Sequence, residues 1–203
     1  MWAGALLAWT LLAGQPSADA ALTLELRVFN GVEDVTTQTR VAIYRASDRG
    51  QPLVLLEAGH RTLTAEVPPG IYDVQAIRLK DGRVTAIRWA ERLVVMAYPD
   101  ERGHHLEVVN FQGGFGALEV RRRDQTLPDV EIYAPGDHTR TVATALPGSG
   151  SVLFVLPAGS YDVATREAGA AVWHAGFEIP ADRTRFWVVP DPGGPIRRGD
   201  GPT

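Results

Sequence analysis

The chain opens, after an apolar leader, with a regular alternation of apolar and polar residues that predicts a β-strand. Residues 22–28 read Leu-Thr-Leu-Glu-Leu-Arg-Val, which places the leucines on one face, and Asn30-Gly31 ends the run with a turn dipeptide. Similar short runs, separated by turn residues, predict further strands at Val41–Tyr44, Leu53–Leu56, Thr62–Val67, Ile71–Leu79, Val84–Trp89, Leu93–Ala97 and His105–Val109. The rest of the chain predicts strands at Ala117–Arg121, Asp129–Tyr133, Thr139–Ala145, Ser151–Leu156, Ser160–Arg166, Ala171–Ile179 and Thr184–Val189. No segment sustains a 3.6-residue apolar period, so we expect an all-β sandwich protein with little helix.

The chain also repeats itself at a fixed spacing. Residues 67–74, Val-Pro-Pro-Gly-Ile-Tyr-Asp-Val, return 89 positions later as Leu-Pro-Ala-Gly-Ser-Tyr-Asp-Val, and the same offset maps residues 41–44 onto residues 130–133. Self-similarity of this kind indicates a duplicated domain. We therefore predict two tandem Ig-like β-sandwich domains, residues 21–112 and 113–190, joined through a short flexible glycine-rich segment at residues 111–116.

The repeated motif is typical of a strand, a sharp corner and a second strand. Glycine allows the backbone to reverse, and the tyrosine can bury its ring while its hydroxyl returns to an upstream backbone acceptor, as in the tyrosine corner of sandwich domains. The structural residues predicted from this motif are Gly70, Tyr72, Val74, Gly159, Tyr161 and Val163.

The two copies of this motif resemble the signature of carboxypeptidase-regulatory-like, or prealbumin-like, sandwich repeats. The resemblance covers roughly residues 21–190 and implies an Ig-like sandwich in a bacterial secreted or envelope protein; the group has no shared catalytic residues to carry over. Two branches of the wider fold do not fit. The chain lacks the Tyr-Arg-Gly-Ser ending of transthyretin-like hydrolases, and its only lysine, Lys80, lies outside the opening strand that a self-cross-linking Cna-B-like domain requires.

The N-terminal residues indicate export. An apolar run over residues 1–14 is followed by Ala18-Asp19-Ala20, a small-x-small cleavage pattern, so residues 1–20 are predicted to be a signal peptide, with no transmembrane segment after its removal. Without a cysteine the exported chain is more typical of a bacterial periplasm or surface than of an animal secretory pathway. Residues 191–203 are rich in glycine and proline, and we expect a disordered tail.

Composition removes several function classes. The net charge of −4 gives no basic footprint for nucleic acid, and the absence of cysteine excludes thiolate metal sites and cysteine nucleophiles. His104 and His105 are adjacent and would project to opposite faces of a strand, so we expect no metal, no cofactor and no catalytic residue. An enzyme would instead require a concave pocket in which a histidine meets a carboxylate or a serine.

The tryptophans leave two interpretations open. Trp89, Trp173 and Trp187 are of the size that a sandwich core accepts, yet an exposed tryptophan can also stack on sugar rings. The sequence therefore predicts a non-catalytic exported module of the bacterial envelope that binds a protein partner, with strand addition at a sheet edge as one way of binding. The alternative is a carbohydrate-binding accessory module with Trp89 and Trp173 as its platform; a hydrolase with an unrecognised site is the third.

Overall fold

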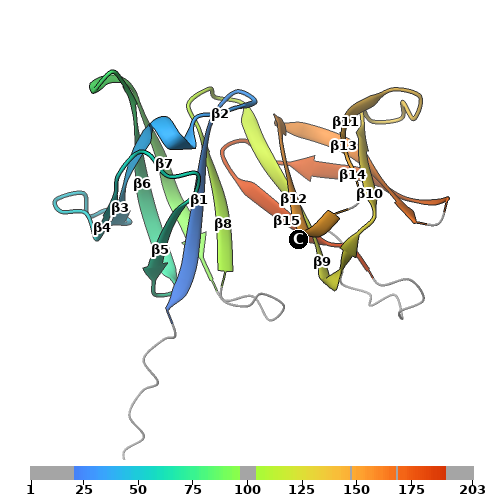
Figure 1. Cartoon of the computed structure of the whole chain (residues 1–203), viewed down its shortest axis with the longest axis horizontal. Coiled ribbons are helices and arrows are strands. Elements are labelled where there is room, and N and C mark those ends of the chain that lie inside the picture. Colours follow the sequence, from blue (N-terminus) through green and yellow to red (C-terminus); the bar gives the residue numbers. More distant parts are fainter. Residues whose placement is uncertain (1–20, 97–103, 147, 168, 191–203) are drawn as a thin grey trace, which may run out of the picture.

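The chain folds into two β-sandwiches in tandem, as the alternation pattern and the repeat predict (Figure 1). The computed structural model describes residues 21–96, 104–146, 148–167 and 169–190. The predicted signal peptide, residues 1–20, and the predicted tail, residues 191–203, lie outside the described residues.

The first sandwich contains two sheets. Its strands are β1 (Leu22–Asn30), β2 (Glu33–Asp34), β3 (Thr39–Arg45), β4 (Val54–Leu56), β5 (Leu63–Val67), β6 (Gly70–Lys80), β7 (Arg83–Val95) and β8 (His104–Asn110). In one sheet β1 pairs antiparallel with β2 and β5 and parallel with β8. The other sheet has the strand order β4-β3-β6-β7 and is antiparallel throughout.

The second sandwich repeats this topology. Its strands are β9 (Phe115–Leu127), β10 (Asp129–Tyr133), β11 (Thr141–Ala145), β12 (Gly148–Pro157), β13 (Gly159–Glu167), β14 (Ala170–Ile179) and β15 (Thr184–Val188). The sheet β12-β9-β15, with β15 parallel to β9, corresponds to β5-β1-β8, and the sheet β11-β10-β13-β14 corresponds to β4-β3-β6-β7. The two copies of the sequence repeat therefore lie on equivalent strands of the two sandwiches.

Each sandwich has its own apolar core. The alternating leucines of β1 face the first core, where Leu24 and Leu26 are fully buried together with Val74 of the repeated motif. In the second core, Leu118 of β9 and Val163 of β13 are likewise fully buried. The period-2 pattern thus places one face of each sheet inward, as hydrophobic burial requires.

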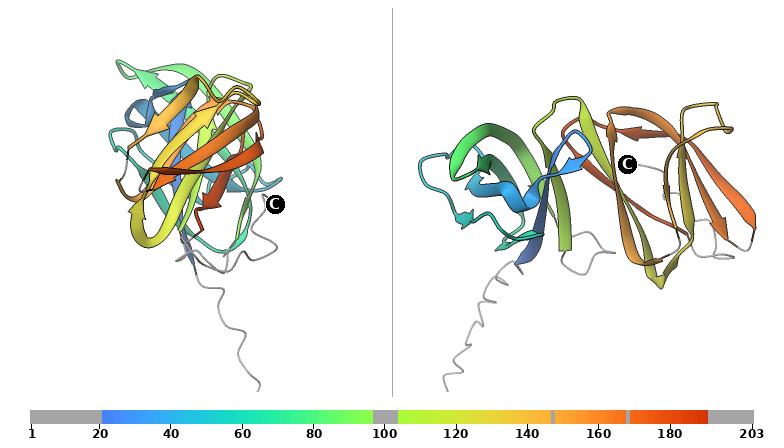
Figure 2. Two further views of the ribbon diagram at one scale, coloured as in Figure 1. Left: turned by 90° about the vertical axis from the view of Figure 1, so that its right-hand side faces the viewer. Right: turned by 45° about the horizontal axis from the view of Figure 1, so that its top comes forward.

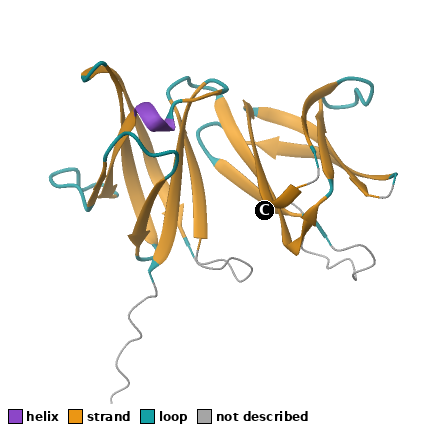
Figure 3. Cartoon of the chain, viewed as in Figure 1, coloured by secondary structure: helices purple, strands orange, loops and turns teal. Residues whose placement is uncertain are grey.

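The strand boundary predicted between Trp89 and Leu93 was wrong. The runs predicted as separate strands at Val84–Trp89 and Leu93–Ala97 form one strand, β7, which continues through a bulge where Arg92 takes a positive φ of 55° (Ala97 lies outside the described residues). A bulge keeps the chain in the sheet while it interrupts the alternation, which is why the pattern read as a break. Helix is confined, in the described part of the chain, to the 3-10 turn η1 (Thr36–Gln38) (Figure 3).

The glycine-rich joint between the sandwiches is held by hydrogen bonds rather than left flexible as predicted. The side chain of Asn110 accepts hydrogen bonds from the backbone N–H groups of Gly31 (2.9 Å) and Gln112 (3.0 Å) and donates one to the carbonyl of Gly31 (2.8 Å). Phe111 packs against the first core. Satisfied buried polar groups of this kind fix a loop in one conformation, so the joint is ordered.

The two sandwiches meet through the outer faces of the β1–β8 sheet and the β9–β15 sheet (Figure 2). Phe29 and Val108 of the first sandwich form a small apolar cluster with Ala117, Leu153 and Val155 of the second. This contact buries apolar surface from both sandwiches and places one sheet face on another.

Polar contacts continue the junction beside this cluster. The hydroxyl of Thr184 accepts the backbone N–H of Val108 at 2.7 Å, and the backbone N–H of Thr184 donates to the Glu107 carboxylate at 3.3 Å. Arg88 of β7 forms an ion pair with Asp182 at 2.8 Å. The free edge of β8 is therefore covered by the start of β15.

Candidate functional site

The tyrosine hydroxyl in each copy of the repeated motif bonds to a backbone carbonyl four residues upstream. The hydroxyl of Tyr72 donates to the carbonyl of Pro68 at 2.6 Å, and that of Tyr161 donates to the carbonyl of Pro157 at 2.8 Å. Burial raises the pKa of both phenols, so they remain protonated donors. The phenols thus occupy equivalent places and connect each corner to its core.

The glycines and valines of the motif serve the same corner. A Cβ at Gly70 would meet the Tyr72 ring at 3.4 Å, an ordinary van der Waals distance, whereas Gly159 has a φ of 156° that L side chains rarely adopt. Val74 and Val163 are fully buried, one in each core. The six motif residues therefore lie at the two corners and in the two cores, and the charged residue of the motif lies between the tyrosine and the valine.

That residue is an aspartate, which our sequence interpretation did not single out. Asp73 and Asp162 are 3% and 5% exposed, and each lies opposite a bulge in the neighbouring strand, β7 or β14. Asp73 Oδ1 accepts the backbone N–H of Arg92 at 2.9 Å, and Asp162 Oδ1 accepts that of Gly176 at the same distance. Both donors have positive φ, 55° and 69°, so each carboxylate holds the bulge of the neighbouring strand.

The second oxygen of each aspartate accepts hydrogen bonds from the loop that follows β3 in the first sandwich and β10 in the second. Arg49 donates to Asp73 Oδ2 at 3.0 Å, and His138 Nε2 donates to Asp162 Oδ2 at 2.8 Å. Arg49 and His138 are 89 positions apart, so they are equivalent in the duplication. Asp162 Oδ2 also accepts the backbone N–H of Gly136 at 2.9 Å.

A tryptophan and a tyrosine complete each arrangement. The guanidinium carbon of Arg49 lies 4.2 Å from the centroid of the Trp89 ring, which is 5.4 Å from that of Tyr44. In the second sandwich His138 stacks on Trp173 with centroids 4.0 Å apart, and Tyr133 lies 5.0 Å from the same ring. Such cation–aromatic contacts contribute roughly 0.5–1 kcal/mol at exposed sites.

We define two clusters from these contacts. The first aspartate cluster comprises Asp73, Arg49, Arg92, Trp89 and Tyr44, and the second comprises Asp162, His138, Gly176, Trp173 and Tyr133. Strand register places both on the outer face of their sheet, away from the core.

The surroundings stabilise both aspartates in their charged form. The backbone N–H groups of Gly136 and Gly176, with His138, lower the pKa of Asp162 from 3.8 to about 2. Burial acts to raise the pKa of Asp73, but the N–H of Arg92 and the guanidinium of Arg49 outweigh it and lower that pKa. Hydrogen bonds to a carboxylate favour its ionised form, so neither aspartate is a proton donor at neutral pH.

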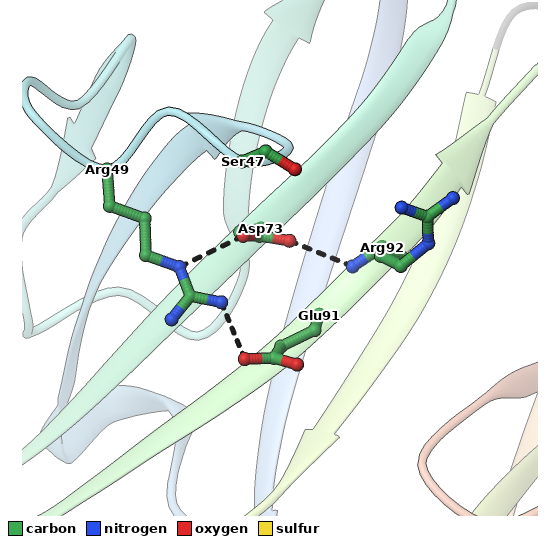
Figure 4. A pocket seen from close by; sticks show the side chains of 5 residues that line it. All are labelled: Ser47, Arg49, Asp73, Glu91 and Arg92. Atoms are coloured by element: carbon green, nitrogen blue, oxygen red, sulfur yellow. Dashed lines mark hydrogen bonds and ion pairs between the residues drawn. The ribbon is translucent and has the colours of Figure 1, made fainter.

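A cavity of about 310 Å³ lies at the first cluster, lined by Ser47, Arg49, Asp73, Glu91 and Arg92 (Figure 4). Arg49 bridges the two carboxylates of this cavity, donating to Asp73 and to Glu91. Two guanidinium groups and two carboxylates share the site, so its charge is balanced and its acids are engaged in hydrogen bonds.

Three histidines contact carboxylates, which is more than the sequence interpretation anticipated. His104 lies 2.9 Å from Glu25, His105 lies 3.0 Å from Glu107, and His138 belongs to the second cluster. The hydrogen bond to Glu25 raises the pKa of His104 and lowers that of Glu25. No histidine lines the cavity of Figure 4, and the described residues contain no group of three or more histidine, aspartate or glutamate side chains that could hold a metal.

The three tryptophans occupy different environments. Trp187 is buried in the second core, as a core aromatic should be. Trp89 is half-buried, and Trp173 is 38% exposed. Both rings of the predicted platform carry a cationic or imidazole side chain on one face, so part of their stacking surface is already occupied.

Membrane insertion through a helix has no support in the described residues, where no helix is long and apolar enough to cross a bilayer.

Comparison with known proteins yields structural likenesses alone. No family model and no curated protein sequence matches the chain. Among solved structures it is similar to the Bacillus anthracis TIE protein (16% identity, 84% of this chain, TM-score 0.31), of whose length the chain spans 34%. It is also similar to a DUF3823 family protein from Parabacteroides merdae (13% identity, 83% of this chain and 100% of that one, TM-score 0.30). A third likeness is to GBS52, the minor pilin of Streptococcus agalactiae (13% identity, 87% of this chain and 100% of that one, TM-score 0.25).

Proposed function

We propose that the chain is a non-catalytic, exported interaction module of the bacterial envelope, built from sandwich domains 21–112 and 113–190, that binds a protein partner by strand addition at β14. The finer assignment to carboxypeptidase-regulatory-like repeats, the signal peptide at residues 1–20 and the periplasmic or secreted location belong to the same proposal. The sandwich topology, the repeated corner motif and the leader sequence support it.

The observation that carries the proposal is the edge of β14. This ten-residue strand pairs with β13 on one side, and no described strand pairs with its other side. Residues 170–177 include no aspartate, glutamate, lysine or arginine, and Val172 and Trp173 are 57% and 38% exposed. A long uncharged edge offers unpaired backbone groups to an added strand, and proteins usually protect such edges.

The equivalent edge in the first sandwich is protected. Strand β7 carries three arginines and a glutamate, Arg83, Arg88, Arg92 and Glu91. In addition, Arg183 of the second sandwich donates to the carbonyl of Glu91 at 3.1 Å, and Asp182 pairs with Arg88. The contrast between equivalent strands favours β14 as the binding edge.

The duplication also argues against catalysis at the aspartate clusters. A general base must lose its proton, which an arginine does not do in proteins. Because Arg49 occupies the position of His138, the role common to both copies is to donate a hydrogen bond to the aspartate. We therefore propose that the clusters hold loop and bulge in place on the sheet face.

The experiment is site-directed photo-cross-linking in the cells that produce the chain. A benzoylphenylalanine at position 172 should yield one discrete adduct, whereas the same residue at position 81, in the exposed β6–β7 turn, should not. Adducts of equal size and yield from both positions, or none from position 172, would contradict partner binding at β14.

A carbohydrate-binding function remains the second candidate because Trp173 is partly exposed. Its platform would comprise Trp89 and Trp173, with a polysaccharide as ligand. Quenching of tryptophan fluorescence by bacterial cell-wall polysaccharide, lost in Trp173→Ala and retained in Trp89→Ala, would assign binding to the second sandwich. An unchanged spectrum at saturating polysaccharide would remove this candidate.

A further inference from the structure

The duplication allows the outer faces of two equivalent sheets to be compared position by position. In the first sandwich, register places Leu55, Ala42, Gln75 and Trp89 in one row across the β4-β3-β6-β7 sheet. The next row contains Arg40, Ile77 and Ile87, in which Ile77 and Ile87 are direct partners. These side chains lie on the face that points away from the core, because the residues that alternate with them on β3, β6 and β7 include the core residues Val41, Ile43, Val74, Ala76 and Ala90.

Two of these positions are charged in the second sandwich. Ala42 corresponds to Glu131, and Ile77 corresponds to Arg166, each at the offset of 89. Glu131 and Arg166 form an ion pair at 2.7 Å, and the hydroxyl of Tyr133 also donates to Glu131 at 2.7 Å. One copy of the sheet face therefore carries a charged pair where the other carries apolar side chains.

The apolar face is exposed at its margins. Leu55 on β4 is 51% exposed and Ile87 on β7 is 57% exposed, while Ala42 and Ile77 between them are buried. Exposed apolar side chains at both margins of one four-stranded face are typical of an interaction surface. The corresponding face of the second sandwich, with its ion pair, is typical of a solvated surface.

We propose that this face of the β4-β3-β6-β7 sheet binds a second copy of the chain in a two-fold dimer, sheet face against sheet face. The charges on this face are the first reason for expecting a second copy as its partner. The face carries three arginines, Arg40, Arg49 and Arg92, and two acids, Asp73 and Glu91, so a two-fold arrangement can set an arginine of one copy against an acid of the other.

The second argument is continuity with a contact that the chain already makes. Its two sandwiches stack through outer sheet faces, with Phe29 and Val108 against Ala117, Leu153 and Val155. Stacking of this fold on another copy of itself is therefore realised within one chain, and the proposed dimer extends the same stack by one further face-to-face contact.

The third argument concerns closure. A head-to-tail contact between the apolar face and the opposite end of the stack would bury the Glu131–Arg166 pair against aliphatic side chains, which carries a desolvation penalty. Apposition of two apolar faces avoids that penalty and closes after two copies, whereas head-to-tail contacts would continue into a filament.

The test uses the exported full-length chain and its equivalent positions as matched controls. Ile87→Glu and Leu55→Glu place a charge in the proposed interface, and Ala171→Glu and Thr144→Glu place the same charge at the corresponding positions of the second sandwich. Sedimentation equilibrium should find a dimer for the parent chain and for both controls, with a Kd at least tenfold higher for each variant in the first sandwich. A monomeric parent chain, or equal effects of the variants in both sandwiches, would overturn the proposal.

A second measurement keeps the result independent of misfolding. The chain has no cysteine, so one spin label at Ile87→Cys or at Ala171→Cys reports a distance between copies. We expect a short distance for the label at position 87 and a much longer one for the label at position 171. The reverse order would overturn the proposed dimer. A dimer disrupted by Val172→Lys and not by Ile87→Glu would assign self-association to the β14 edge, again overturning this proposal while leaving that edge as a binding site.

Discussion

Gly116, at the start of β9, offers a test of the packing between β9 and the turn before β15. A Cβ added at this glycine would lie 2.1 Å from the carbonyl oxygen of Pro180 and 2.8 Å from Ile179 Cγ2. The first of these neighbours is backbone, which must move by about 1 Å to reach an acceptable contact. Gly116→Ala is therefore a steric perturbation whose size can be worked out from the neighbouring hydrogen bonds.

Those hydrogen bonds flank the glycine on both sides. Phe115 accepts the backbone N–H of Asp182 at 2.8 Å, and Ala117 donates its N–H to Arg183 at 3.0 Å. Overpacking a tight site costs about 1–3 kcal/mol, and each strained hydrogen bond adds about 0.5–1.5 kcal/mol. We expect Gly116→Ala to lower the free energy of unfolding by about 2–4 kcal/mol, or Tm by roughly 5–15 °C for a chain of this size.

Gly113 in the same joint is the matched control. Nothing lies within 4 Å of a Cβ built there, and its φ is outside the left-handed region, so Gly113→Ala should leave stability unchanged or raise it slightly. Urea unfolding followed by tryptophan fluorescence and by far-ultraviolet circular dichroism gives both free energies. If the two variants differ by less than about 0.5 kcal/mol, the reasoning from the Pro180 contact is refuted.

Three further predictions follow from individual hydrogen bonds. Tyr72→Phe removes the bond to Pro68 and should cost about 1 kcal/mol in urea unfolding; an unchanged midpoint would show that this corner does not depend on its hydroxyl. Asp162 has a pKa lowered to about 2, so its contribution is complete above its ordinary value of 3.8 and is lost as pH falls through about 2. The stability difference between the parent chain and Asp162→Asn, measured across pH 2–7, should therefore vanish at the acid end, and a pH-independent difference would contradict the assignment. The pKa of His104 is raised by Glu25, so the stabilisation lost in His104→Gln should be present below the ordinary value of 6.5 and disappear as pH rises through the raised pKa; unfolding at acid and alkaline pH measures it, and a larger loss at alkaline pH would reverse the sign.

The duplicated aspartate was available in the sequence but was read as part of a structural signature. Asp73 and Asp162 recur at the offset of 89, and so do Arg49 and His138, which lie in loops where no strand pattern draws attention to them. What hid the cluster is the change of offset at Trp89 and Trp173, which are 84 positions apart because the paired strands β6 and β7 extend further toward their turn than β13 and β14 do. Only strand register brings these residues together.

The alternation of apolar and polar residues by itself determined the all-β class and most strands, and the repeated motif indicated the corners at Tyr72 and Tyr161. These features depend on interactions between residues close in sequence, where the period of a strand and the chemistry of a turn act directly. Tertiary structure alone decided that β7 continues through its bulge, that Asn110 fixes the joint, and that β14 is left as an open edge while Asp182 and Arg183 cover that of β7. These features depend on contacts between distant segments, and the free energy of such contacts is set by geometry that no local pattern encodes.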